Sequence, residues 1–296
     1  MDSVKVKAFG KLNLYLDIVG KRNDGYHLLR TVMQSVSVCD TLLFRTEEGE
    51  GFELVCDAPG FPKDNTNLIC KAAKAFLEFT EMPPRGKLTV TVDKKIPMMA
   101  GMAGGSADCA ATIVALNELY GNPLSKKHIL ELAAKLGADV PFTATGGTVL
   151  CEGIGEQMTK LSDLNGLYFA VVQPEIKIST PSAYKAYDSK PPFKKKSYPR
   201  FAKALELKEP QLIADGIFNA LEIAVADPNI TEIKERFIAS GALGAQMTGS
   251  GSAVFGIFDD WRKAEACIDR MNIQGYPYAA VLEPVNSGLE ITKNAK

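Results

Sequence analysis

A glycine-rich stretch carries the strongest chemical signal in this sequence. It reads P-M-M-A-G-M-A-G-G-S-A over residues 97–107. Glycine lets backbone N–H groups approach a ligand closely, and the first turn of a following helix adds unpaired N–H groups and a partial positive charge. The stretch therefore predicts a phosphate site; a tight turn that only joins a strand to a helix is the alternative. The predicted phosphate-binding residues are Pro97, Met98, Met99, Ala100, Gly101, Met102, Ala103, Gly104, Gly105, Ser106 and Ala107.

Two well-known phosphate loops do not fit this stretch. A P-loop ends in Gly-Lys-Ser/Thr, whereas Gly105 is followed by Ser106 and Ala107. The run G-M-A-G-G also departs from the dinucleotide pattern G-x-G-x-x-G, and no acidic residue ends a second strand ~20 residues later. A different class of phosphate loop is therefore expected.

Two ionisable side chains stand in largely apolar surroundings. Lys11 lies in the alternating run K-L-N-L-Y-L-D-I, which places it on one strand face with Asn13, about 6–7 Å away. Asp139 lies in G-A-D-V-P-F. From spacing alone, a solvated lysine and an aspartate that caps a turn or helix are the alternatives. A partly buried carboxylate needs a cationic partner, and Lys11 is the best candidate for Asp139.

The elements around these groups can be predicted from periodicity and turn residues. Alternation over 87–95 predicts a half-buried strand before the glycine stretch, and the apolar residues after Ser106 predict a buried helix that ends before Gly121. A hairpin is expected around Asn23-Asp24-Gly25. Further helices are expected at 65–79 and at 126–136, the second with Ser125 and Gly137 as its caps.

For the second half of the chain we predict strands (β) and helices (α) in the order β-α-α-α-β-β-α-β. Thr180 is predicted to cap a helix with Pro181 in its first turn. Residues 191–199, which include Lys194–Lys196, are predicted to form a mobile basic loop. A single helix is predicted over 211–226. Helices packed against an antiparallel sheet predict an α+β fold. Polar residues interrupt the apolar pattern over 152–165, and we predict the domain boundary there. The two predicted domains are 1–158 and 159–296.

Composition excludes several classes of function. The 296 residues carry a net charge of −1 and no basic stripe, which disfavours nucleic acid as a partner. No apolar run approaches the ~18 residues of a membrane span, and the first ten residues lack a signal region. Six cysteines without a C-x-x-C pair predict reduced core residues of a cytoplasmic protein, and only two histidines argue against a histidine-rich metal site. We expect small-molecule substrates, no nucleic-acid or membrane partner, and a monomer or weak homodimer.

Four segments resemble motifs of one enzyme superfamily. The stretch from Pro97 to Ala111 resembles the phosphate loop of the GHMP kinases, which include galactokinase, homoserine kinase and mevalonate kinase. The runs A-F-G-K-L-N-L, G-A-D-V-P-F and A-Q-M-T-G-S-G are similar to further motifs of these kinases, and G-K-R-N-D-G-Y-H resembles the family of diphosphocytidyl-methylerythritol kinases within them. Met102, Ala107 and Cys109 depart from the usual Leu, Ser and Ala, and Ala107 removes a hydroxyl that could touch phosphate or metal.

The resemblance implies a two-domain GHMP kinase fold with the active site in the interdomain cleft and a ferredoxin-like second domain. It implies transfer of the γ-phosphoryl group of ATP, used with Mg²⁺ and without a tightly bound cofactor, to the 2-hydroxyl of a diphosphocytidyl sugar alcohol. Lys11 and Asp139 would be catalytic, and Asn67 is a weaker candidate near the adenine. The implied acceptor-binding residues are Asn13, Tyr26, His27, Thr180, Tyr184, Gly249 and Ser250.

Some assignments stay open at this stage. Core packing is the alternative for Tyr184, and no metal ligand is assigned. The charge of Asp108 opposes phosphate, so it either faces a magnesium ion or caps the helix. Another GHMP kinase, such as homoserine or mevalonate kinase, would leave G-K-R-N-D-G-Y-H unexplained. A catalytically silent nucleotide-binding regulator is the other alternative, and the presence of both Lys11 and Asp139 argues against it.

Overall fold

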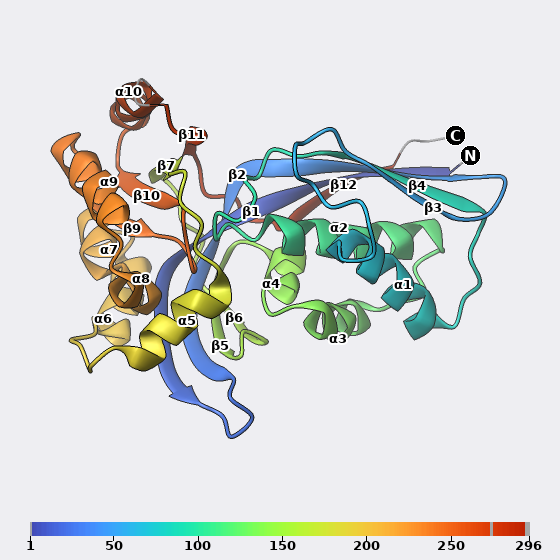
Figure 1. The fold of residues 1–296 in the computed structure, drawn as a ribbon, viewed down its shortest axis with the longest axis horizontal. Coiled ribbons are helices and arrows are strands. Elements are labelled where there is room, and N and C mark those ends of the chain that lie inside the picture. The colour runs from blue at the N-terminus through green and yellow to red at the C-terminus, as the bar shows by residue number, and fades with distance from the viewer. Residues whose placement is uncertain (1, 273–274, 294–296) are drawn as a thin grey trace.

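A computed structural model describes residues 2–272 and 275–293 of the chain. Two sheets with helices packed on them make up the molecule, as the α+β prediction requires (Figure 1). The large sheet has the strand order β12-β1-β2-β4-β3, with β5 and β8 pairing β2 and β1, and β6 pairing β5. Its strands are β1 (Asp2–Lys21), β2 (His27–Glu47), β3 (Phe52–Val55), β4 (Lys87–Asp93), β5 (Thr148–Gly153), β6 (Gln157–Lys160), β8 (Phe218–Asn219) and β12 (Leu289–Lys293).

Four helices cover one face of the large sheet (Figure 1). They are α1 (Leu68–Thr80), α2 (Gly104–Leu119), α3 (Lys126–Leu136) and α4 (Val140–Thr145). Helix α2 is buried on most sides, because its Ala, Ile and Leu residues face the sheet as well as the neighbouring helices. The predicted caps of α3 are confirmed, since Ser125 accepts a hydrogen bond from the His128 N–H and Gly137 ends the helix.

The small sheet is antiparallel, with the order β11-β7-β10-β9. Its strands are β7 (Tyr168–Gln173), β9 (Gly244–Met247), β10 (Val254–Phe258) and β11 (Tyr278–Leu282). The accompanying helices are α5 (Thr180–Ser189), α6 (Tyr198–Leu207), α7 (Pro210–Gly216), α8 (Ala220–Val225), α9 (Pro228–Ala239) and α10 (Trp261–Asn272). The boundary near residue 158 stays a proposal: β8 and β12 come from the second half of the chain but pair with β1 of the large sheet.

Two local predictions for the second half were wrong, and one loop is shorter than predicted. The expected helix over 211–226 is broken at β8, because the Asn219 side chain caps α8 and also donates to the Met247 and Gly249 carbonyl oxygens. The cap of α5 is Ser179 rather than Thr180, since its hydroxyl accepts from the Ser182 N–H. The basic loop ends where α6 begins at Tyr198, and it is anchored by Lys195, which lies 2.7 Å from Asp17.

Within the described residues, none of the helices is both long enough and apolar enough to cross a membrane. All six cysteines are free; four of them are buried as predicted, whereas Cys39 and Cys70 are only partly buried.

Candidate active site

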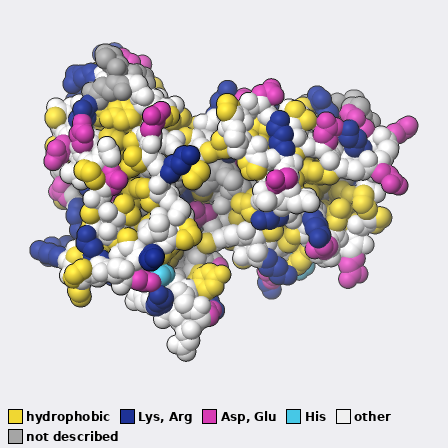
Figure 2. All heavy atoms as spheres, viewed as in Figure 1, with side chains coloured by type: hydrophobic (Ala, Val, Ile, Leu, Met, Phe, Trp, Pro, Cys, Tyr) yellow, Lys and Arg dark blue, Asp and Glu magenta, His cyan; other side chains and the backbone are white. Residues whose placement is uncertain are grey.

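A cleft of about 710 Å³ runs between the helices of the large sheet and those of the small sheet. Figure 2 shows the surface hollowed between these two halves. Most of the predicted site residues line this cleft, together with Asn67 at the start of α1. They are Lys11, Asn13, Asp139, Thr180, Tyr184, Gly249, Ser250 and residues 97–106 of the glycine stretch. Ala107 lies behind this surface and is fully buried.

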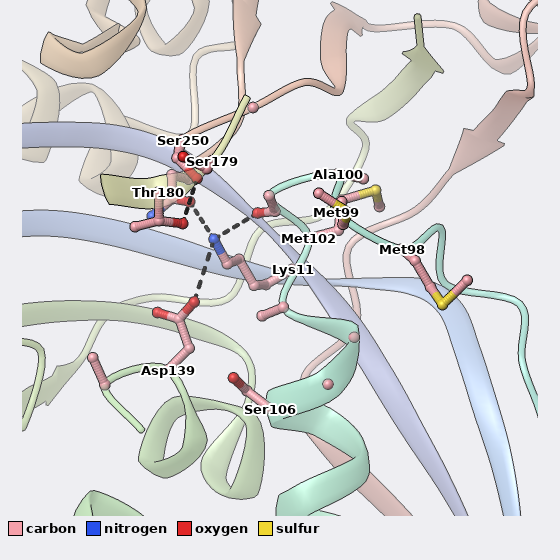
Figure 3. A pocket seen from close by; sticks show the side chains of 18 of the residues that line it. Lys11, Met98, Met99, Ala100, Met102, Ser106, Asp139, Ser179, Thr180 and Ser250 are labelled. Atoms are coloured by element: carbon pink, nitrogen blue, oxygen red, sulfur yellow. Dashed lines mark hydrogen bonds and ion pairs between the residues drawn. The ribbon is translucent and has the colours of Figure 1, made fainter. Parts of the chain in front are cut away.

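The backbone of the glycine stretch turns sharply between β4 and α2. Met99, Gly101 and Ala103 all have positive φ, at 57°, 75° and 58°. Ala103 is the N-cap of α2 and offers no side-chain acceptor, so the first-turn N–H groups receive no capping bond from a side chain. Such a helix start is suited to bind an anion. Ser106 lies in this first turn, on the cleft side (Figure 3).

Both halves of the molecule hold this loop in place. The Lys11 N–H donates to the Met102 carbonyl oxygen at 3.1 Å, and the Gln173 amide donates to the Met98 carbonyl oxygen at 3.0 Å. A Cβ atom at Gly101 would overlap the Thr248 carbonyl oxygen, so only glycine permits this close approach. The loop is therefore a rigid part of the cleft wall.

Lys11 and Asp139 face one another across the cleft floor (Figure 3). The Lys11 Nζ atom lies 3.8 Å from Asp139 Oδ2, and it donates to Asn13 Oδ1 at 2.5 Å and to the Gly101 carbonyl oxygen at 2.8 Å. The Lys11 side chain is 4% exposed and that of Asp139 is 39% exposed. Burial lowers the pKa of Lys11, and the Asp139 carboxylate opposes this shift.

Local sequence explains how Asp139 is aimed. Gly137 ends α3, and Pro141 starts the short helix α4, so Asp139 lies at the junction of two helices. Asp139 occupies the N-cap position of α4 but its side chain makes no capping hydrogen bond. The capping alternative is therefore wrong, and the carboxylate is directed at Lys11 instead.

Residues from the small-sheet half close the opposite side of the cleft. Gly249 has a φ of 56°, and a Cβ there would come within 3.3 Å of Lys11 Nζ. The Thr180 and Ser250 hydroxyls lie 2.9 Å apart and can hydrogen-bond (Figure 3). Asn13 is 3% exposed, and its amide nitrogen donates to the Thr31 hydroxyl at 2.8 Å. The amide nitrogen of Asn13 is thus occupied by Thr31, while its Oδ1 atom accepts from Lys11.

The hairpin residues Tyr26 and His27 do not line the cleft themselves. Tyr26 is 63% exposed, whereas the His27 ring stacks on Tyr184 with ring centroids 4.8 Å apart. His27 Nε2 lies 2.7 Å from Asp188 Oδ1, and Lys21 lies 2.6 Å from the other carboxylate oxygen. Burial raises the pKa of the Tyr184 phenol to about 12, so it stays neutral. Asp188 thus binds both His27 and Lys21 and holds the hairpin against α5. Asp188 was not identified from the sequence.

Asp108 does not have the capping role that was one of its two alternatives. Its Oδ2 atom lies 2.9 Å from the Lys94 ammonium group, which also pairs with Asp40. Within 2–272 and 275–293, no group of three or more His, Cys, Asp or Glu side chains could hold a metal ion.

Comparison with known proteins places these features in one family. The family models described as GHMP kinases N terminal domain and GHMP kinases C terminal match residues 67–147 and 190–277. A protein of Clostridium novyi (strain NT) named 4-diphosphocytidyl-2-C-methyl-D-erythritol kinase is 40% identical, over 89% of this chain and 94% of its own. A protein of the same name from Thermoanaerobacter pseudethanolicus is 39% identical, over 98% and 99%.

Solved structures agree with this result. A crystal structure of 4-(cytidine 5'-diphospho)-2C-methyl-D-erythritol kinase matches with a TM-score of 0.77 and 30% identity, covering 94% of this chain and 98% of the other. A homoserine kinase from Cytophaga hutchinsonii has the same TM-score at 20% identity, covering 99% and 98%, which shows the shared fold alone.

Proposed function

This chain belongs to the 4-diphosphocytidyl-2-C-methyl-D-erythritol kinase family of the GHMP kinases, and we propose how its cleft carries out phosphoryl transfer. The enzyme is a kinase that transfers the γ-phosphoryl group of ATP to the 2-hydroxyl of 4-diphosphocytidyl-2-C-methyl-D-erythritol, in the non-mevalonate route to isoprenoid precursors. The observation that carries the mechanism is the Lys11–Asp139 pair, 3.8 Å apart and beside the glycine loop.

The loop and the start of α2 bind the polyphosphate of ATP. Uncapped first-turn N–H groups point at the anion, and the positive φ values at Met99, Gly101 and Ala103 bring the backbone close to it. Because the loop is fixed by Lys11, Gln173 and the close contact at Gly101, binding requires little reorganisation.

Asp139 and Lys11 act on the transferring group. Asp139 accepts the proton of the acceptor hydroxyl while the hydroxyl oxygen forms a bond to the γ-phosphorus. The bond between the γ-phosphorus and the β,γ-bridging oxygen breaks at the same time, and ADP leaves. Lys11 keeps Asp139 oriented and stabilises negative charge on the transferring group. Its buried amine is held in place by Asn13 and the Gly101 carbonyl oxygen, so the charge is preorganised.

The acceptor occupies the cleft beside α5. We assign Tyr184 to stack on the cytosine, with His27 supporting its ring and Thr180, Gly249 and Ser250 near the reacting end. Asn13 contributes through Lys11. Tyr26, although exposed on the hairpin, is adjacent to His27 and is assigned to the outer edge of the cytidine site.

Mg²⁺ is expected to enter as the ATP complex. Bound with ATP, the ion would neutralise phosphate charge during phosphoryl transfer. The ammonium partner of Asp108 and the lack of a carboxylate cluster among the described residues indicate that the protein contributes few ligands of its own. We further propose that the enzyme acts in the cytoplasm as a monomer or weak homodimer, which the six free cysteines support with respect to the compartment.

An acceptor-selectivity assay tests the proposal. ADP release is measured with ATP and, in turn, the diphosphocytidyl sugar alcohol, methylerythritol phosphate, homoserine and mevalonate. Turnover should require the cytidine diphosphate group, because Tyr184, supported by His27, is assigned to stack on the cytosine. Equal turnover of methylerythritol phosphate and its cytidylyl derivative would contradict the assignment, and preferred turnover of homoserine or mevalonate would indicate another GHMP kinase activity.

A further inference from the structure

A buried charge cluster lies beside the glycine loop. It consists of Asp40 on β2, Lys94 just after β4 and Asp108 in α2, and all three side chains are at most 5% exposed. The Lys94 ammonium group donates to Asp40 Oδ2 and, at 2.9 Å, to Asp108 Oδ2. Two carboxylates therefore share one ammonium group, and Lys94 and Asp108 both reach the cleft surface.

Asp40 fixes the point at which the loop leaves β4. Its Oδ1 atom accepts hydrogen bonds from the Lys95 and Ile96 N–H groups, at 2.6 and 2.8 Å. At the other end of the loop, a Cβ atom at Gly104 would lie 2.8 Å from Lys94 Nζ. The start of α2 thus rests against the same ammonium group, and the cluster ties both ends of the loop to β2.

The charges of this cluster do not balance unless one carboxyl group holds a proton. Asp108 Oδ1 is buried and has no hydrogen-bond partner among the described residues. Burial raises the pKa of Asp108 to about 8; Lys94 opposes the rise, and the charge of Asp40 adds to it. Burial alone would lower the pKa of Lys94, but Asp108 and Asp40 raise it, so Lys94 stays charged.

The other titratable groups around the cluster do not compensate for it. Cys109 follows Asp108 on α2, and Tyr278 on β11 faces Asp40. Burial raises the pKa of each to about 12, so both are neutral near pH 7 and neither supplies a positive charge. The cluster is therefore neutral with Asp108 protonated and carries one negative charge with Asp108 ionised.

We propose that Asp40, Lys94 and Asp108 form a proton-linked brace of the phosphate loop, in which Asp40 and Lys94 position the loop and Asp108 must hold a proton for ATP to bind tightly. An uncompensated negative charge beside the start of α2 opposes the polyphosphate, and low dielectric strengthens this repulsion. The proton comes from solvent, and no bond to ATP is involved. The inference rests on the proposed function only in taking ATP as the ligand.

Calorimetric titration with ATP, without acceptor, tests the proton linkage. From pH 7 to pH 9 the wild-type affinity should fall about tenfold, whereas Asp108→Asn should keep an affinity within about twofold of the wild-type value at pH 7. Asp40→Asn should also lose the pH dependence, because Lys94 and an ionised Asp108 then balance. Asp17→Asn is the matched control: Asp17 pairs with Lys195 in another part of the molecule, so its variant should keep the wild-type slope.

The positioning role of Asp40 has its own readout. Asp40→Ala removes the acceptor of two loop N–H groups and should weaken ATP binding at pH 7 about tenfold, whereas Asp40→Asn retains an acceptor and should rescue it. A wild-type pH slope in Asp108→Asn, or loss of ATP binding by this variant at pH 7, would overturn the proton linkage. If the wild-type protein binds no ATP at any pH, the proposed function fails first.

Discussion

Replacement of Asp139 by asparagine removes one charge at the cleft floor while keeping the shape of the side chain. The carboxylate lies 3.8 Å from Lys11 Nζ and is 39% exposed, whereas Lys11 is 4% exposed. The glycine loop does not use Asp139, so its N–H groups remain available for ATP. We therefore expect Asp139→Asn to bind ATP with nearly wild-type affinity and to turn over slowly.

The size of the effect separates a structural from a catalytic role. Two unit charges at this distance interact by about 1 kcal/mol in water and about 4 kcal/mol at an effective dielectric constant near 20. Because Asp139 is partly exposed, we take about 1–2 kcal/mol as the strength of its pair with Lys11. Loss of a general base costs about 10²–10⁴-fold in kcat, which is roughly 3–5 kcal/mol. The loss of turnover should thus exceed what the ion pair alone can explain.

The assay measures kcat and the ATP dissociation constant for Asp139→Asn, Lys11→Met and the double variant, with the melting temperature of each as a control. The double variant should be much less impaired than the product of the two single effects, since residues that act as a unit are not additive. Full multiplicativity would mean that Lys11 and Asp139 act independently. Near-wild-type turnover in Asp139→Asn would remove this residue from the mechanism.

Three further predictions concern the walls of the cleft. Gly104→Val should impair ATP use more than folding, because its Cβ would lie 2.8 Å from Lys94 Nζ; normal ATP affinity per folded molecule would make this glycine purely structural. Tyr184→Ala should cost about 1–3 kcal/mol in kcat/KM for the acceptor if the ring stacks on the base, and unchanged kinetics would assign it to packing. The pKa of Asp108 is about 8 in the folded protein and ~3.9 in an unfolded chain. Between about pH 4 and pH 8 the native state therefore binds more protons than the unfolded state, so the free energy of unfolding falls as the pH rises through this range. Urea unfolding at about pH 6 and pH 8 should show a loss of about 2 kcal/mol in the free energy of unfolding that Asp108→Asn lacks, and an equal loss in both proteins would refute this shift.

The sequence predicted the parts of the site whose chemistry is local. A glycine stretch between an alternating strand and an apolar helix could be recognised because backbone N–H groups at a helix start need only short-range geometry. Lys11 and Asp139 were singled out by the resemblance of A-F-G-K-L-N-L and G-A-D-V-P-F to kinase motifs, and the apolar neighbours of Asp139 pointed the same way. Their 3.8 Å separation could not be predicted, because it depends on how β1 packs against the start of α4.

The rest of the site depends on side chains that meet through the fold. Asp40 and Lys94 are 54 positions apart in the chain, and neither belongs to a motif. Asp40 did carry a signal, since an aspartate inside the apolar run S-V-C-D-T-L-L needs a buried partner, but periodicity does not say which one. The contact of Asp188 with His27 depends likewise on α5 packing against the hairpin. The break at Asn219 arises from side-chain hydrogen bonds to β9 and the next loop, which the helical pattern of 211–226 conceals.

The position of the new phosphate group tests the central claim most directly. The protein is incubated with ATP and the diphosphocytidyl sugar alcohol, and phosphorus NMR of the product locates the added group through its coupling to the carbon skeleton. We predict one equivalent of ADP and a single new phosphomonoester on the 2-hydroxyl, with the cytidine diphosphate group intact. Phosphorylation at another hydroxyl, or ADP release without a phosphorylated acceptor, would contradict the account.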